Sequence, residues 1–353
     1  MTKRIVFACA GSEDLSAAVP ALAREHDAEV VTLALDLGQD QELEQVHQRA
    51  LRAGALRAHV LDVREEFARD FILPVLQNGA LRHAQEPITF PLAHALIAKK
   101  LVDVALIEDA TAVAHHGSRD DLARIESHVR TLNANLHIVA CGTAANPVAT
   151  HANLWGRAID YDVFEAAPHL PYVLTKSVEA APDTGADVEI EFEEGVPVAV
   201  NGVSLDLTEL IESVSIIAGQ HGVGRIAAIH EPTRREPFRM YEAPAATVLH
   251  AAHDALEFAT ASADLMQLKW TLREKYVELV MRGLWFTDVR EALDAFGSVV
   301  QRHVTGAAHV QLRKGQCTVS AHGLPGSTVA PSNASPGSTS VAAGRPEVAV
   351  RPS

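Results

Sequence analysis

The sequence predicts an α/β fold in its first half, followed by an α+β domain. Short apolar runs at residues 3–9 and 29–35 are typical of buried strands, and the segment between them has the apolar spacing of a helix. After about residue 160 the pattern changes, because polar and apolar residues begin to alternate as in a sheet with one wet face. Strands that alternate with helices indicate a parallel sheet covered on both faces.

The other elements of the first domain continue this alternation. Helices are expected at 16–26, 40–53, 64–77, 91–106 and 119–131, and strands at 59–62, 111–114 and 137–140. Ligands of such folds lie at the carboxyl ends of the strands. The loops after Phe7, Leu35 and Ala114 should therefore face one cleft.

The second domain is expected to be an antiparallel sheet with helices. The predicted elements are a hairpin at 187–200, helices at 206–219, 245–260, 265–282 and 287–304, and a second hairpin at 308–320. Residues 321–353 are rich in Ser, Pro, Gly and Ala and contain no aromatic residue, so a disordered tail is expected. The predicted division is 1–160, 161–320 and 321–353.

Composition limits the classes of partner. The net charge of −15 argues against nucleic acid or an anionic membrane as the main partner, because both attract clustered Lys and Arg. The three cysteines, Cys9, Cys141 and Cys317, are too scattered for a disulfide framework, which favours a reducing compartment. No apolar run approaches the roughly 20 residues that span a bilayer. A cytoplasmic protein is expected.

The turn between the first strand and the first helix could bind an anion. Residues 7–16 read FACAGSEDLS, and a loop that enters a helix offers unpaired N–H groups and the positive end of the helix dipole. Taken alone, the segment is more often an ordinary turn.

This segment resembles the pyrophosphate loop of the argininosuccinate synthase family, and further resemblances follow in the same order. They are Ala34–Gln39, Arg64–Asp70, Leu96–Lys100, Asn153–Arg157, Gly195–Ala199, His221–Ile226, Tyr241–Pro244, Gly283–Phe286 and Arg290–Phe296. The resemblance implies a nucleotide-binding domain of the ATP pyrophosphatase type followed by a synthetase domain. It also implies an enzyme of arginine biosynthesis, a C–N ligase that uses ATP and Mg²⁺ to join citrulline to aspartate through a citrullyl-adenylate, and a homo-oligomer.

The resemblance implies two sets of site residues. The ATP-binding positions are Ala8, Gly11, Ser12, Asp14, Ser16, Leu35 and Gly117. The substrate-binding positions are Ser118, Asp120, Asp121, Arg124, Glu231 and Tyr241. Read without the resemblance, Leu35 is typical of a strand core, and the acidic residues before Arg124 are typical of a solvated helix start. No protein metal ligand is expected, because His115 and His116 should point to opposite faces and His250 with His253 suit a packed helix.

Several positions depart from the family. Ser12 and Glu13 stand in the phosphate loop where the family has glycine and leucine, and different side chains occupy Arg82, Phe90 and His94. Three hypotheses therefore remain. They are a citrulline–aspartate ligase, a diverged ligase for another ureido or carboxylate substrate, and a catalytically silent homologue that acts as a binding or regulatory subunit.

Overall fold

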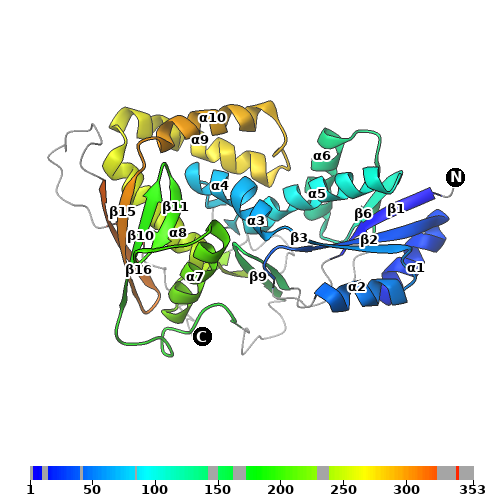
Figure 1. The fold of residues 1–353 in the computed structure, drawn as a ribbon, viewed down its shortest axis with the longest axis horizontal. Coiled ribbons are helices and arrows are strands. Elements are labelled where there is room, and N and C mark those ends of the chain that lie inside the picture. The colour runs from blue at the N-terminus through cyan, green and yellow to red at the C-terminus, as the bar shows by residue number, and fades with distance from the viewer. Residues whose placement is uncertain are drawn as a thin grey trace, which may run out of the picture.

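A computed structural model shows two parts that lie side by side (Figure 1). It describes residues 3–9, 15–39, 43–83, 86–141, 150–161, 172–228, 238–323 and 339–341. The first part is the blue and cyan half of the ribbon and the second is the green to orange half. The expected order, a parallel-sheet domain and then a mixed domain, is confirmed.

The first sheet is parallel throughout, with strand order β3-β2-β1-β6-β7. Its strands are β1 (Lys3–Ala8), β2 (Ala28–Asp36), β3 (Arg57–Asp62), β6 (Ala112–His115) and β7 (His137–Ala140). Because the strands are parallel, their carboxyl ends lie at one edge of the sheet, as predicted. The chain continues from β1 to β2 on one side and reaches β6 on the other. The strand order thus reverses between β1 and β6, and ligands of open α/β sheets bind at such a point.

Helices cover both faces of this sheet (Figure 1). Helices α1 (Leu15–His26) and α2 (Leu43–Arg52) lie on one face, and α5 (Thr89–Ile107) and α6 (Arg119–Leu132) lie on the other. Alternation along β1 explains this packing, since Ile5 and Phe7 belong to one buried cluster and Val6 and Ala8 to another. None of the described helices is long and apolar enough to cross a bilayer.

The helix predicted at 64–77 has three segments, α3 (Arg64–Phe67), the π-helical η1 (Ala68–Ile72) and α4 (Leu73–Gln77). Pro74 lacks the N–H that a continuous α-helix would bond to residue 70. The Leu73 N–H instead reaches back five residues to the Ala68 carbonyl. The proline thus accounts for the change of hydrogen-bonding register that the sequence prediction did not include.

The second part contains an antiparallel sheet with order β12-β11-β10-β15-β16-β17. Its strands are β10 (Ala186–Glu193), β11 (Val196–Val200), β12 (Val203–Ser204), β15 (Gly306–Arg313), β16 (Gln316–Gly323) and β17 (Thr339–Val341). Its helices are α7 (Leu207–Gln220), α8 (Pro244–Thr260), α9 (Ala263–Met281) and α10 (Asp288–Gln301). Both predicted hairpins and all four predicted helices are present. The last hairpin extends to Gly323, beyond the expected limit of 320, and β17 pairs with its outer strand.

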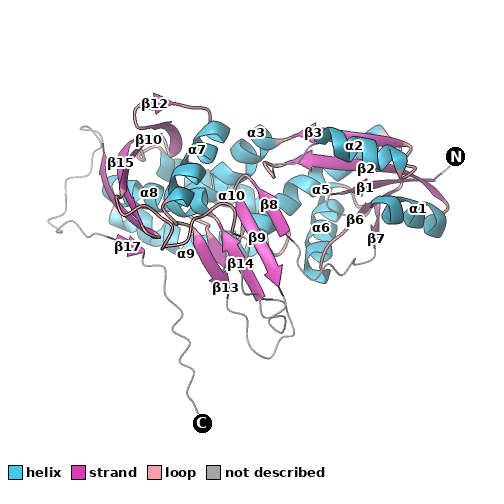
Figure 2. Cartoon of the chain, turned by 90° about the horizontal axis from the view of Figure 1, so that it is seen from below, coloured by secondary structure: helices cyan, strands magenta, loops and turns pink. Residues whose placement is uncertain are grey.

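A four-stranded sheet that the sequence analysis did not predict lies between these parts (Figure 2). Its strands, in the order β13-β14-β9-β8, are Arg225–Ala228, Phe238–Glu242, Gly156–Tyr161 and Thr150–Asn153. A two-stranded ribbon of β4 (Arg82–His83) and β5 (Glu86–Pro87) was also not predicted. The boundary expected at residue 160 falls within β9, which pairs with β14 of the later chain.

The fully buried carboxylate of Glu242 links this sheet to residues 173–175 through hydrogen bonds. It accepts hydrogen bonds from the backbone N–H groups of Val173, Leu174 and Thr175 at 3.1, 3.0 and 2.9 Å. The Arg157 guanidinium donates to it at 3.0 Å and compensates its charge. Removing one of these donors should destabilise the fold, because the buried charge would then be less well compensated.

Candidate functional site

The candidate site begins where the strand order reverses. Ala8 at the end of β1 is paired in register with His115 at the end of β6. The chain then passes through Gly117 into α6, and a Cβ added to Gly117 would lie 2.9 Å from the Cβ of Asp121. This close approach favours glycine, and it brings the loop after β6 against the first turn of α6.

The first turn of α6 is closed by a capping box. The Ser118 hydroxyl accepts a hydrogen bond from the Asp121 N–H at 3.3 Å, and the Asp121 carboxylate accepts one from the Ser118 N–H at 3.1 Å. Two N–H groups that a helix start leaves unpaired are thereby satisfied. Asp120 points to solvent. Of the predicted substrate residues here, Ser118 and Asp121 thus also determine where the helix starts.

The Asp121 carboxylate is the centre of a charged cluster. Arg124 Nη1 donates to its Oδ1 at 2.9 Å, and His94 Nε2 lies 3.8 Å from the same oxygen. Burial alone would raise the pKa of Asp121. The charges of His94 and Arg124 and the hydrogen bonds to Ser118 outweigh burial and lower this pKa to about 2. Asp121 and Arg124 are only 15% and 16% exposed. They are therefore not the solvated charges of an ordinary helix start.

Arg124 also reaches the second domain. Its Nε donates to the backbone carbonyl of Met281, at the end of α9, at 2.8 Å. In the part of the chain that the structure describes, its Nη2 has no hydrogen-bond partner. A guanidinium fixed at two nitrogens, with a third available, can receive a carboxylate from a ligand.

Tyr241 comes to the same region from β14. It is 2% exposed, and its ring stacks on Phe90 with a centroid distance of 6.4 Å. Phe90 and His94 lie one turn apart on α5. One turn of α5 thus contacts both Tyr241 of the second domain and Asp121 of the first.

The predicted ATP-binding residues are only partly described. Ala8 and Leu35 are 7% exposed and belong to the hydrophobic core, and Ser16 is exposed on α1. The core position of Leu35 agrees with its interpretation as a strand residue. Gly11, Ser12, Asp14 and the predicted substrate residue Glu231 lie outside the described residues.

His115 and His116 have different neighbours. The His115 ring lies edge-on to His94 of α5 at 6.1 Å, whereas the His116 ring lies edge-on to Phe7 at 5.1 Å. His94 and Phe7 belong to opposite sides of the sheet, so the two histidines diverge as expected for adjacent residues at a strand end.

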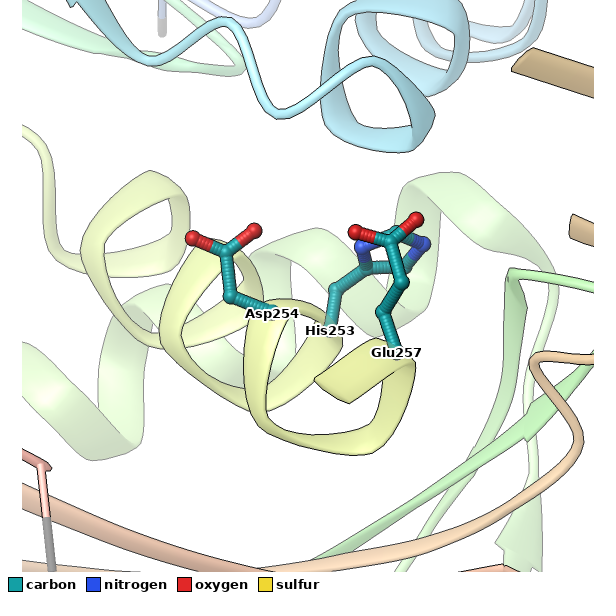
Figure 3. A group of neighbouring side chains, drawn as sticks. All are labelled: His253, Asp254 and Glu257. Atoms are coloured by element: carbon teal, nitrogen blue, oxygen red, sulfur yellow. The ribbon is translucent and has the colours of Figure 1, made fainter. Parts of the chain in front are cut away.

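A second cluster of possible ligands projects from α8 (Figure 3). Ligand atoms of His253, Asp254 and Glu257 lie within 4.8 Å of one another. The sequence interpretation of His250 and His253 as residues of a packed helix did not include Glu257. Lys269 already contacts the buried Glu257 carboxylate, and Arg273 donates to Asp254 at 2.9 Å. Because two cations already compensate these carboxylates, the cluster fits an ion network better than a metal site. The network is buried at Glu257 and Lys269 and partly exposed at Asp254 and Arg273.

Comparison with known proteins identifies the family. Residues 4–158 match the arginosuccinate synthase N-terminal HUP domain, and residues 149–335 match the arginosuccinate synthase C-terminal domain. An argininosuccinate synthase from Symbiobacterium thermophilum is 41% identical over 89% of this chain and 86% of its own length. The chain belongs to the argininosuccinate synthase family.

Two further matches differ in how much of the chain they cover. An argininosuccinate synthase from Dehalococcoides mccartyi is 37% identical over 90% of this chain and 86% of its own length. Among solved structures, a universal stress protein from Archaeoglobus fulgidus is 16% identical over 40% of this chain and 95% of its own, with a TM-score of 0.23.

The sequence reasoning missed two parts of the site. His94 was noted as a departure from the argininosuccinate synthase pattern, but not as the neighbour of Asp121. The Met281 carbonyl was not considered, because a backbone acceptor carries no residue-type signal. The one available hint was Gly283, since a glycine directly after a helix marks its C-terminal end.

Proposed function

We propose that this chain is an ATP-dependent C–N ligase that joins citrulline to aspartate in arginine biosynthesis. In the first step, the ureido oxygen of citrulline attacks the α-phosphorus of ATP, forming citrullyl-adenylate and releasing pyrophosphate. In the second, the aspartate amine attacks the ureido carbon and AMP leaves, which gives argininosuccinate. The observation that carries the proposal is the fixed guanidinium of Arg124 in a member of the argininosuccinate synthase family.

Arg124 would bind the carboxylate of citrulline through its available Nη2. The opposing charge of Asp121 prevents the guanidinium from turning away, since the two side chains are joined at 2.9 Å. Asp121, Asp120 and Ser118 at the start of α6 would receive polar groups of the two amino acids. Tyr241 would complete the site from the second domain, and Glu231 is proposed with it from the family pattern.

ATP would bind at the carboxyl end of β1. The phosphates would meet the loop residues Gly11, Ser12, Asp14 and Ser16 before α1, with adenine near Ala8 and Leu35 and the nucleotide bordered by Gly117. Catalysis of this kind depends on alignment and on charge neutralisation more than on proton transfer. Mg²⁺ would enter with the ATP phosphates and supply that neutralisation. We further propose that the protein is cytoplasmic, that it forms a homo-oligomer, and that nucleic acid and membrane are not partners.

Substrate-dependent release of pyrophosphate tests the function. Arg124→Ala should raise the citrulline KM by roughly ten- to a hundredfold, because a charge-assisted contact contributes about 1.5–3 kcal/mol. The KM for ATP should change less than about twofold. Arg130→Ala is the matched control, since Arg130 is an exposed arginine of the same helix. Equal citrulline kinetics in the two variants would remove Arg124 from the substrate site.

The outcome for the parent protein separates the rival functions. Pyrophosphate release that requires citrulline, together with AMP release that also requires aspartate, supports the ligase. Release with another ureido or carboxylate compound, but not with citrulline, would identify a diverged ligase. ATP binding without turnover would favour a regulatory homologue, for which the altered Ser12 and Glu13 are the relevant observation.

A further inference from the structure

The end of α9 is a helix terminus that depends on glycine. Gly283 has φ of +71°, in the left-handed region. The Gly283 N–H donates to the Val280 carbonyl at 3.2 Å, and the Leu284 N–H donates to the Leu279 carbonyl at 2.8 Å. These two bonds form a Schellman motif, which satisfies carbonyls that a helix end otherwise leaves unpaired.

The Met281 carbonyl, in the last turn of α9, accepts its hydrogen bond from another domain. Its partner is Nε of Arg124, at 2.8 Å. The carboxyl end of a helix carries partial negative charge, so a guanidinium is favoured there. The same guanidinium is held at Nη1 by Asp121, so a helix end and a carboxylate together fix its plane.

The backbone of α6 leaves room only for a hydrogen atom at position 283. A Cβ added to Gly283 would lie 2.7 Å from the carbonyl oxygen of Arg124 and 3.0 Å from its Cα. These are backbone atoms, so the clash could be relieved only by moving α6 and α9 apart. One turn further along α6, His128 packs edge-on against Phe286 at 5.6 Å. The contact between the helix end and α6 is therefore continuous over two turns.

We propose that residues Met281–Gly283 are a positioning element for substrate recognition. They hold the Arg124 guanidinium at the angle that directs Nη2 toward the substrate carboxylate. Binding of citrulline in the first domain then depends on a backbone acceptor that the second domain supplies. The proposal rests on the proposed role of Arg124 as the partner of that carboxylate.

Gly283→Ala tests the proposal, with Gly202→Ala as its matched control. Gly202 has φ of +74° in the same domain, and a Cβ added there meets nothing within 4 Å. Both variants introduce the same backbone strain, but only G283A displaces Arg124. The citrulline KM should rise about ten- to a hundredfold in G283A, with the ATP KM within about twofold of the parent. G202A should keep the parent's citrulline KM.

A double mutant shows whether the effect passes through Arg124. In an Arg124→Lys background the side chain cannot bridge Met281 and Asp121 while leaving a third nitrogen for a ligand. G283A should then add less than about twofold to the citrulline KM. If G283A does not fold, Gly283→Asn replaces it, because asparagine adopts the left-handed region more readily and adds the same Cβ.

The outcomes separate this proposal from the function on which it rests. An equal citrulline KM in G283A and G202A, or fully additive effects of G283A and Arg124→Lys, would overturn the positioning role while leaving the ligase intact. Absence of citrulline-dependent turnover in the parent protein would overturn the proposed function first.

Discussion

Acid should weaken the contact between α6 and the end of α9 through His128. The imidazole is 1% exposed and packs against Phe286, and neither ring nitrogen has a hydrogen-bond partner within the described part of the chain. Burial is the main cause that lowers the pKa of His128 from 6.5 to about 3, and the charges of His94 and Arg124 add to it. The folded protein therefore holds this imidazole in its neutral form.

The sign and size of the effect follow from proton linkage. Between pH 6.5 and about 3, the unfolded chain binds a proton at His128 that the folded chain does not, so stability falls as the pH falls. The stability that depends on neutral His128 is fully present above pH 6.5. The assay value of pH 5.0 lies roughly 1.5 units below the ordinary histidine pKa of 6.5. At about 1.4 kcal/mol per unit, protonation of His128 in the unfolded chain alone lowers the free energy of unfolding by about 2 kcal/mol.

Denaturant unfolding at pH 7.5 and pH 5.0 measures this loss. His250 and His253 are also buried with lowered pKa values, so the parent protein should lose more than the His128 share. The informative quantity is the difference between the parent and His128→Leu, which should lose about 2 kcal/mol less over the same interval. His303→Leu, at an exposed position, is the control. An equal pH dependence in His128→Leu and the parent would refute the reasoning.

Three further predictions concern stability and nucleotide binding. Glu242→Gln should lower the free energy of unfolding by roughly 3 kcal/mol in urea titrations, because it places an amide N–H₂ among N–H donors. A loss under about 0.5 kcal/mol would contradict this prediction. Lys269→Met should cost about 3–5 kcal/mol by leaving the Glu257 carboxylate buried and uncompensated, and Glu257→Gln in the same chain should recover part of the loss. Ser12→Gly with Glu13→Leu should tighten ATP binding about tenfold or more in calorimetry, since both a Cβ and a carboxylate are removed from the loop; an unchanged Kd would place the phosphates elsewhere.

The first domain was predictable because its signals are local. Each buried strand is a short apolar run, and each helix between strands has its own periodicity, so the order of β1, β2, β3, β6 and β7 could be inferred along the chain. The change of register at Pro74 was not inferred, although the proline was visible. Periodicity alone does not distinguish a π-helical turn from an α-helical one.

The small sheet of β8, β9, β13 and β14 was missed because its strands pair with distant parts of the chain. The strand Phe238–Glu242 contains Arg239 and Glu242, and its partner β9 lies about 80 residues earlier in the chain. A buried glutamate contradicts the ordinary pattern of a strand, and only its partners, among them Arg157, make that burial favourable. Such pairings depend on residues that meet only in the folded chain, so no local sequence pattern predicts them.

Contacts of α5 in the candidate site were likewise not predictable from local patterns. Phe90 and His94, one turn apart, contact Tyr241 of the second domain and Asp121 of the first. Through these two contacts, one turn of α5 links the two halves of the proposed site. A site arranged in advance loses less conformational entropy on binding, and its reacting groups need less movement to align. For the ligase we propose, whose rate would depend on alignment rather than on proton transfer, the packing of α5 against both domains would help to hold the proposed substrate-binding side chains in place.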